Sequence, residues 1–389
     1  MNKSKRRIIV IIASSLIIIL ITISLVYFNT QENNVEIKSL LKEYNAELQE
    51  NENMHLEEDT SGDKVPVPNG YVGSRADGEN EIDTGYVIYE GTEEVTDENV
   101  EEAQKTRNQY VWIPVPDVST MYGIDENGKK WGKIYNFATS SSNANYNELT
   151  GAYPNNWSES DGVMKISKSL NREPDYANTN YDMSSAIKVL DLGAQSTYEW
   201  LIQLEREFNS MIESVEKYNG FYIGRYETGN LSKNIAVVVK ENSDIKSIGK
   251  RWYNSYKLSK TLSLEKDNVV TGMIWGCQWD RVLIWLVESK NRTIEQICDS
   301  KEWGNYAGTW AGLKVTGYSE EWKVANIYDL AGNVNEWTME NGSWGMGRVT
   351  RGNAYWNSTS SVSNRTQDSP YGSNSYGVTA GSRAMLYIK

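Results

Sequence analysis

Apolar residues are most concentrated near the start of the chain, where positions 8 to 28 include no charged residue. A run of this length crosses about 30 Å of hydrocarbon as a single helix, at about 1.5 Å rise per residue. Four basic residues lie between positions 3 and 7, whereas positions 29 to 34 contain none. Because positive residues stay on the cytoplasmic side, we expect residues 1–7 in the cytoplasm, a transmembrane helix at 8–28, and a single-pass cell membrane protein whose C-terminal bulk is extracellular. A cleaved signal peptide is the alternative, but its apolar region is usually about 7–15 residues long and ends in a small-x-small site, which Ser24 to Phe28 does not offer.

The pattern after this run predicts an acidic stalk at residues 29–64. Apolar residues at near-helical spacing between Val35 and Leu48 are followed by a polar, acidic tract from Glu50 to Asp63. Such a stretch can form a short helix, but it has too few apolar residues for a core of its own.

Beyond the stalk, short apolar runs predict strands at 86–89, 110–115, 220–227 and 235–239. Apolar residues recur at spacings of three and four between Leu201 and Tyr218, which predicts a helix from about Thr197 to Tyr218. A second helix is expected from about Asp280 to Glu288. We therefore divide the exported part into residues 65–195, strands with a long loop insertion, and residues 196–389, a second region that contains both helices.

Composition restricts the possible functions. The formal charge is −13, which argues against nucleic acid as a partner because phosphates require a basic patch. His55 is the single histidine of the sequence, so most histidine-dependent chemistry is excluded. The two cysteines, Cys277 and Cys298, could pair in an oxidising exterior or stay buried and unpaired.

Segments in the second half of the chain resemble the formylglycine-generating enzyme or sulfatase-modifying-factor family. They are Gly220 to Asn230, Met273 to Asp280, and the string Tyr-Asp-Leu-Ala-Gly-Asn-Val-Asn-Glu-Trp-Thr that ends at Thr338, followed by Arg348 to Gly352 and Gly381 to Arg383. The resemblance covers roughly residues 215–389, and the family's usual Leu-Pro-Thr-Glu-x-Glu-Trp-Glu segment is not recognisable. It implies an α+β domain with a C-type-lectin-like fold, short irregular strands and two main helices.

The same resemblance implies a calcium ion in the loop from Asp329 to Glu336. The ligands carried over by position are the side chains of Asp329 and Glu336 and the backbone carbonyls of Gly332 and Val334. Calcium takes about 6–8 oxygen ligands, and a glycine-containing turn can aim carbonyls inward. We expect a structural rather than a catalytic ion. The alternative is a turn whose carboxylates cap nearby amides.

The family's catalytic ligands are not found in this sequence. The generating enzymes bind copper through two cysteines, and an ungapped alignment places those positions on Asn357 and Val362, which cannot supply thiolates. A related branch binds iron through several histidines, which one histidine cannot replace. We therefore expect neither copper nor iron and lean towards a protein that is not an enzyme, with an active oxidoreductase of this family as the alternative.

The remaining hypothesis is binding of an extracellular protein or glycan. The stretch from Asn353 to Tyr376 is rich in Asn, Ser, Thr and Tyr, a composition used by evolved binding loops, although ordinary polar loops share it. A variable binding protein of a diversity-generating retroelement would carry such a loop near its C-terminus. The candidate ligand-binding residues are Tyr355, Trp356, Asn357, Asn364, Tyr371, Asn374 and Tyr376.

Overall fold

The computed structural model describes most of the chain after residue 46. The described residues are 47–124, 128, 130–140, 143–148, 197–232, 235–242, 252–307, 312–341, 348–358, 360–368 and 380–389. Residues 48–389 form one compact unit, with a core supplied by two clusters of their own buried side chains. The unit therefore has a hydrophobic core of its own, as expected of a domain that can fold independently.

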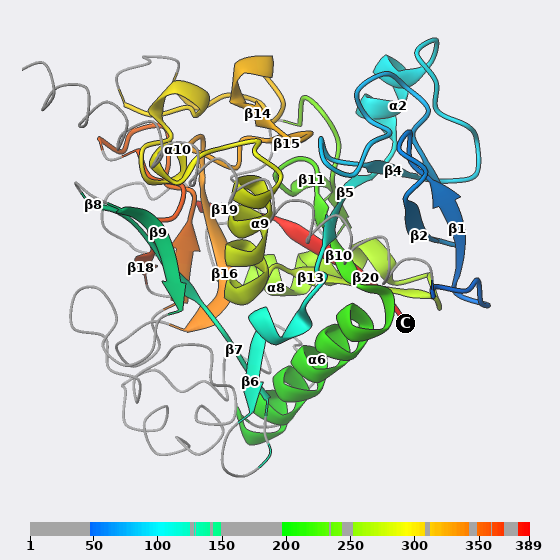
Figure 1. Ribbon diagram of the computed structural model, residues 1–389, viewed down its shortest axis with the longest axis horizontal. Coiled ribbons are helices and arrows are strands. Elements are labelled where there is room, and N and C mark those ends of the chain that lie inside the picture. Colours follow the sequence, from blue (N-terminus) through cyan, green and yellow to red (C-terminus); the bar gives the residue numbers. More distant parts are fainter. Residues whose placement is uncertain are drawn as a thin grey trace, which may run out of the picture. The chain divides into compact units, whose positions relative to one another are not determined.

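A six-stranded antiparallel sheet is the centre of this unit (Figure 1). In spatial order its strands are β13 (Val269–Met273), β20 (Ala384–Ile388), β10 (Gly220–Gly224), β5 (Gln109–Pro114), β4 (Val87–Glu90) and β3 (Tyr71–Gly73). Side chains of β5 alternate between the two clusters, with Val111 and Ile113 in one and Tyr110 and Trp112 in the other. Because both faces of the sheet are covered, its strands read as continuous apolar runs.

Two long helices belong to the first cluster. Helix α6 (Thr197–Tyr218) contributes Phe208 and Met211, and helix α9 (Gly276–Glu288) contributes Leu283 and Trp285. The prediction of the helix at 197–218 is confirmed. The second predicted helix is also present, but it begins at Gly276 because the side chain of Gln278 accepts a hydrogen bond from the backbone N–H of Trp275 (3.0 Å).

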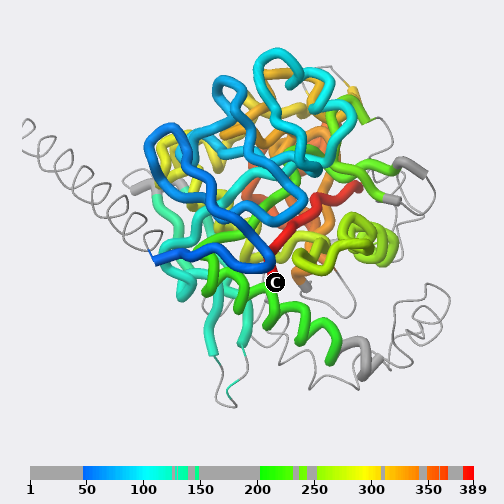
Figure 2. Tube along the Cα trace, turned by 90° about the vertical axis from the view of Figure 1, so that its right-hand side faces the viewer, coloured from blue at the N-terminus to red at the C-terminus, as the bar shows by residue number. Residues whose placement is uncertain are grey.

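A two-stranded ribbon contributes to the other cluster. Strand β1 (Met54–Glu58) pairs antiparallel with β2 (Lys64–Pro68), and Met54, Val65 and Val67 are buried. The start of the unit lies beside its C-terminal strand (Figure 2), where Asn53 Nδ2 donates to the backbone carbonyl of Lys389 (2.7 Å). Residues 48–64, assigned to the stalk from the sequence, therefore belong to the folded unit.

A second sheet carries the loop from Asp329 to Glu336. Its order is β18 (Thr366–Asp368), β17 (Arg348–Arg351), β16 (Asn335–Asn341) and β19 (Ala380–Ser382), and β16 runs parallel to β19. The other strands form two-stranded sheets: β6 (Tyr122–Ile124) with β7 (Lys130–Gly132), β8 (Tyr135–Ser140) with β9 (Asn143–Glu148), β11 (Gly229–Ser232) with β12 (Ile235–Val237), and β14 (Lys323–Val324) with β15 (Ile327–Tyr328). The shorter helices are α2 (Val100–Thr106), η1 (Val118–Thr120), α8 (Trp252–Ser259), η2 (Lys260–Ser263), α10 (Ile294–Cys298), η3 (Lys301–Trp303) and η4 (Glu320–Trp322).

This architecture corrects the predicted fold class. We expected an α+β domain of short irregular strands and two main helices behind a transmembrane helix, but the structure is mixed α/β and built on a continuous six-stranded sheet. Its strands come from residues 71 to 388, and pairing over such separations leaves no local pattern. No helix within the described ranges is long and apolar enough to cross a membrane. The segment 8–28, where the membrane helix was predicted, lies outside the described residues.

Candidate functional site

The loop from Asp329 to Glu336 leads from β15 into β16 through a tight backbone turn. Asp329, Gly332 and Asn333 have φ values of 55°, 83° and 59°, the left-handed region that suits Gly, Asn and Asp. A Cβ on Gly332 would lie 2.1 Å from the backbone oxygen of Asn305, so only glycine fits there. The sequence Asp-Leu-Ala-Gly-Asn therefore fixes how the following strand enters the sheet.

This turn brings together a buried group of charges, which we call the carboxylate centre: Glu227, Asp329, Glu336 and Arg383. The four side chains are almost completely buried. Arg383 holds Glu336 with two hydrogen bonds, from Nη2 to Oε1 (2.6 Å) and from Nε to Oε2 (3.0 Å). Such a fork-to-fork pair fixes Glu336 at the start of β16.

Glu227 and Asp329 are held by uncharged donors rather than by a cation, and one of the donors to Asp329 is the hydroxyl of Thr316. Glu227 accepts from Asn333 Nδ2 (2.7 Å) and from the backbone N–H of Val334 (3.3 Å). Asp329 Oδ2 accepts from the backbone N–H of Gly317 (2.7 Å). Its second oxygen, Oδ1, is buried and has no hydrogen-bond partner in the described structure.

The carboxylate centre therefore has three acids and one guanidinium. Burial is the main cause that raises the pKa of Asp329 to about 6 and the pKa of Glu336 to about 7, although Arg383 lowers both. Burial, together with the neighbouring acids Asp329 and Glu336, raises the pKa of Glu227 well above its usual range. When all three acids are ionised, the centre has an excess of negative charge that either protons or a cation must neutralise.

The negative charge and the carboxylate oxygens of this centre suit a hard cation. Each carboxylate oxygen that accepts one hydrogen bond keeps a second lone pair, and Asp329 Oδ1 has both. Within the described ranges, however, no three or more His, Cys, Asp or Glu side chains are grouped as a ready-made metal cage. Backbone carbonyls, such as those predicted at Gly332 and Val334, would have to complete the coordination. Glu227 was not among the predicted ligands, although it lies in the segment from Gly220 to Asn230 that carries the resemblance. A carboxylate at that position, directly after Tyr226, could have indicated a further acid of the site.

A second buried group, the ion-pair quartet, consists of Asp280, Glu340, Arg351 and Arg365. Arg351 binds Asp280 Oδ1 (2.6 Å) and Glu340 Oε2 (3.3 Å). Arg365 binds the other oxygens of the same two carboxylates, at 2.8 Å for Glu340 Oε1. The quartet has no net formal charge, and it joins helix α9, strands β16 and β17, and the residue before β18.

The predicted ligand-binding residues lie only partly within the described structure. Trp356 is 46% exposed, whereas Tyr355, Asn357 and Asn364 are half-buried. Asn357 folds back on its own turn, because its Oδ1 accepts from the backbone N–H of Ala354 (2.7 Å). The remaining candidates, Tyr371, Asn374 and Tyr376, lie outside the described residues.

The positions of the family's copper cysteines have structural roles here. Val362 is completely buried in the first core cluster, and Asn357 holds the turn described above. Cys277, in helix α9, and Cys298, in helix α10, are not joined by a disulfide. Burial raises the pKa of the Cys277 thiol, so it is not a reactive thiolate.

Comparisons with known proteins give partial likenesses only. No family model and no curated protein matches the chain. The crystal structure of CarF covers 44% of this chain and 87% of its own, with 14% identity and a TM-score of 0.32. Treponema denticola variable protein 1 covers 72% of this chain and 95% of its own, with 12% identity and a TM-score of 0.26. At these TM-scores neither likeness assigns a family or a function to the chain.

Proposed function

We propose that residues 48–389 form a non-catalytic binding domain outside the cytoplasm, and that its binding surface is the loop from Asn353 to Arg365. The observation that carries this proposal is that Trp356 is exposed while the residues at both ends of its loop are buried. Arg351 and Arg365, on either side of the loop, are held in the ion-pair quartet, with side chains 0% and 5% exposed. The location outside the cytoplasm rests on the charge asymmetry of the sequence around residues 8–28.

A loop held in this way is suited to recognition. Ala354 and Val362 anchor it from within, since both are fully buried. A loop that is already ordered loses less conformational entropy when it binds. Tryptophan is enriched among the residues that dominate binding energy, because it offers a large rigid contact area. An extracellular protein is the ligand that this surface fits best, with a glycan as the second class.

The alternative of a copper oxidoreductase finds no support in the residues at the corresponding positions. A thiolate pair would be needed at Asn357 and Val362, and neither side chain can bind Cu(I). Stoichiometric copper or iron in the purified domain would overturn the non-catalytic part of the proposal.

We also propose calcium as a structural ion of the carboxylate centre, with Asp329 and Glu336 as side-chain ligands and Gly332 and Val334 as carbonyl ligands. The excess of acids over cations supports this proposal, and so does the orphaned Oδ1 of Asp329. A bound divalent cation would neutralise the charge that burial makes costly.

The binding proposal is tested with Trp356→Ala in residues 48–389. The immobilised domain is offered extracellular proteins in a pull-down and glycans on an array, and each captured ligand is then titrated. We expect at least tenfold weaker binding by the variant, because an anchoring tryptophan commonly contributes about 2 kcal/mol or more.

The matched control is Tyr318→Ala, which removes another exposed aromatic side chain (57% exposed) outside the 353–365 loop. Wild-type affinity in this control is expected. Equal affinities of the wild type and Trp356→Ala for every captured ligand would overturn the assignment of the surface.

The more specific alternative, a variable protein of a diversity-generating retroelement, has a genomic test. A near-copy of the DNA that encodes residues 351–389, differing at adenines and lying beside a reverse transcriptase gene, would establish it. A neighbourhood without such a copy would exclude it.

A further inference from the structure

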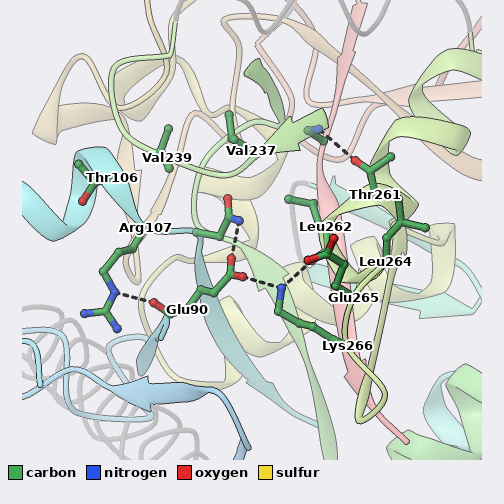
Figure 3. Close-up of a pocket in the computed structure, with 12 residues that line it drawn as sticks. Glu90, Thr106, Arg107, Val237, Val239, Thr261, Leu262, Leu264, Glu265 and Lys266 are labelled. Atoms are coloured by element: carbon green, nitrogen blue, oxygen red, sulfur yellow. Dashed lines mark hydrogen bonds and ion pairs between the residues drawn. The ribbon is translucent and has the colours of Figure 1, made fainter. Parts of the chain in front are cut away.

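A cavity of about 450 Å³ is lined by 12 residues, none of which belongs to the 353–365 loop (Figure 3). Its walls come from the end of β4, the residues just before β5, the segment around β12, and the stretch from η2 to Lys266. Its volume is within the range of about 300–1,000 Å³ that is typical of small-molecule sites. No residue of this cavity has a role in the calcium or loop proposals.

Two of the charges in the cavity neutralise each other. Lys266 Nζ pairs with Glu90 Oε1 at 2.5 Å, and Asn108 Nδ2 donates to Glu90 Oε2 at 2.6 Å. Figure 3 shows Glu90 between Arg107 on one side and Lys266 on the other. This pair forms a polar wall with no charge to spare for a ligand.

Arg107 is a cation without a carboxylate partner among the described residues. Its Nε donates to the backbone oxygen of Glu90 (2.5 Å), and its Nη1 donates to the backbone oxygen of Glu93 (2.9 Å). Both acceptors are neutral carbonyls. Burial lowers the pKa of Arg107, and the nearby carboxylates of Glu93 and Glu90 raise it without forming an ion pair with the guanidinium in the described structure. The two carbonyls fix its orientation, and Nη1 retains a second N–H for another acceptor.

Glu265 supplies the opposite charge. It lies beside Lys266 at the far side of the cavity from Arg107 (Figure 3). The described structure shows no ion pair or hydrogen bond of the Glu265 carboxylate. The cavity therefore has an unpaired positive end and an unpaired negative end.

The surface between these ends is aliphatic. Val237, Val239 and Leu262 line it, together with Leu264, which is 74% exposed. A leucine exposed to this degree beside a cavity gains about 25 cal/mol for each Å² of apolar surface that a ligand covers. A ligand that matches all three features has an anionic end, a cationic end and aliphatic groups between them.

We propose that this cavity binds a short zwitterionic peptide with aliphatic side chains. Its α-carboxylate lies on Arg107, its α-ammonium on Glu265, and its side chains on Leu262 and Leu264. A simple anion would leave Glu265 and the aliphatic lining without a role, and a fatty acyl chain would leave Glu265 unpaired. The proposal does not depend on the function proposed for the 353–365 loop.

Calorimetric titration of residues 48–389 with trivaline tests this assignment, because the two ends of the peptide can be changed separately. The C-terminal amide should bind about tenfold more weakly or worse, because it loses a charged hydrogen bond to Arg107. N-acetylation should weaken binding about two- to fivefold, the range of an exposed ion pair. No binding of free trivaline at millimolar concentration, or equal binding of all three forms, would overturn the proposal.

The variant Glu265→Gln separates the ligand contact from general charge effects. It should weaken binding of free trivaline by the same factor as N-acetylation, and it should leave the binding of N-acetyl-trivaline unchanged. The matched control is Asp267→Asn, which removes a negative charge two residues away, outside the cavity lining. If both variants weaken trivaline equally, Glu265 is not the ammonium partner; if free valine binds as tightly as trivaline, the ligand is not a peptide.

Discussion

The carboxylate centre and the ion-pair quartet are both buried, and both take a glutamate from strand β16, yet they differ in charge. Glu340 in the quartet shares two arginines with Asp280. Glu336 in the carboxylate centre shares a single arginine with two further acids. The quartet is complete with the residues of the chain, whereas the carboxylate centre is not. A buried charge is tolerated only where it is paired. The quartet meets this condition with its own arginines, whereas the carboxylate centre needs protons or a cation from solution.

The largest effect is expected when the quartet is made to resemble the carboxylate centre. Arg351→Met removes a cation that contacts both acids and leaves Asp280 and Glu340 with Arg365 alone. Breaking a buried pair from one side costs about 3–5 kcal/mol. Urea unfolding of residues 48–389 measures this loss of unfolding free energy.

The control for this variant is Lys105→Met, because Lys105 pairs with Glu241 at 3.5 Å and both side chains are about half-exposed (48% and 53%). Exposed pairs contribute at most about 1 kcal/mol. Equal losses in the two variants would show that the quartet does not stabilise the fold more than a surface pair does.

A smaller effect, of opposite sign, is expected when the carboxylate centre is made to resemble the quartet. In chelator at pH 8, Asp329→Asn should raise the melting temperature by a few degrees, because it removes one uncompensated charge. The amide oxygen can still accept the hydrogen bonds that reach Oδ2 from Gly317 and Thr316. A lower melting temperature would show that the ionised Asp329 is stabilising without a cation.

The pH dependence of the melting temperature in chelator also tests whether the carboxylate centre has uncompensated charge. The pKa values of Asp329 and Glu336 rise from 3.8 and 4.5 to about 6 and about 7 in the folded protein. The folded state therefore binds these protons more tightly than the unfolded chain, and their contribution to stability is complete below about pH 4. It is lost as the pH rises through 6 and 7, so the melting temperature should fall from pH 5 to pH 8. The fall should be smaller for Asp329→Asn, and an equal fall would contradict the assignment to this centre.

Local features of the fold were predictable from the sequence because they depend on neighbouring residues. The spacing from Leu201 to Tyr218 gave helix α6 its bounds, and the apolar runs placed β4, β5, β10 and β12 within a few residues. Apolar residues also alternate at Met54 and Leu56 and at Val65 and Val67, a strand-like pattern that the prediction of a stalk did not use. The acidic residues around it concealed this signal, so the stalk was assigned too many residues.

The sequence placed Asp329 and Glu336 in one loop, but the other members of the two buried groups could not be predicted, because they depend on contacts between distant segments. Asp280 and Arg351 are 71 positions apart, and Asn333 and Glu227 are 106 apart. Nothing in the local sequence distinguishes Glu340, which is paired by two arginines, from Glu336, which is paired by one. The cavity at Arg107 is likewise assembled from four separated segments, and no sequence motif predicts it.

Asp329→Asn is a more informative variant for calcium than Glu336→Gln. Glu336→Gln would remove the partner of Arg383 as well as a proposed ligand, so its effect on melting mixes two causes. Asp329→Asn removes a proposed ligand that has no ion-pair partner within the described part of the chain.

The most direct test of the excess charge in the carboxylate centre is the melting temperature of residues 48–389 at pH 8 in millimolar calcium and in EGTA. A ligand that binds only the folded state at about 100 times its Kd adds about 2.7 kcal/mol. We predict that calcium raises the melting temperature of the wild type by several degrees and has little effect on Asp329→Asn. Identical melting of the wild type in calcium and in EGTA would contradict the account.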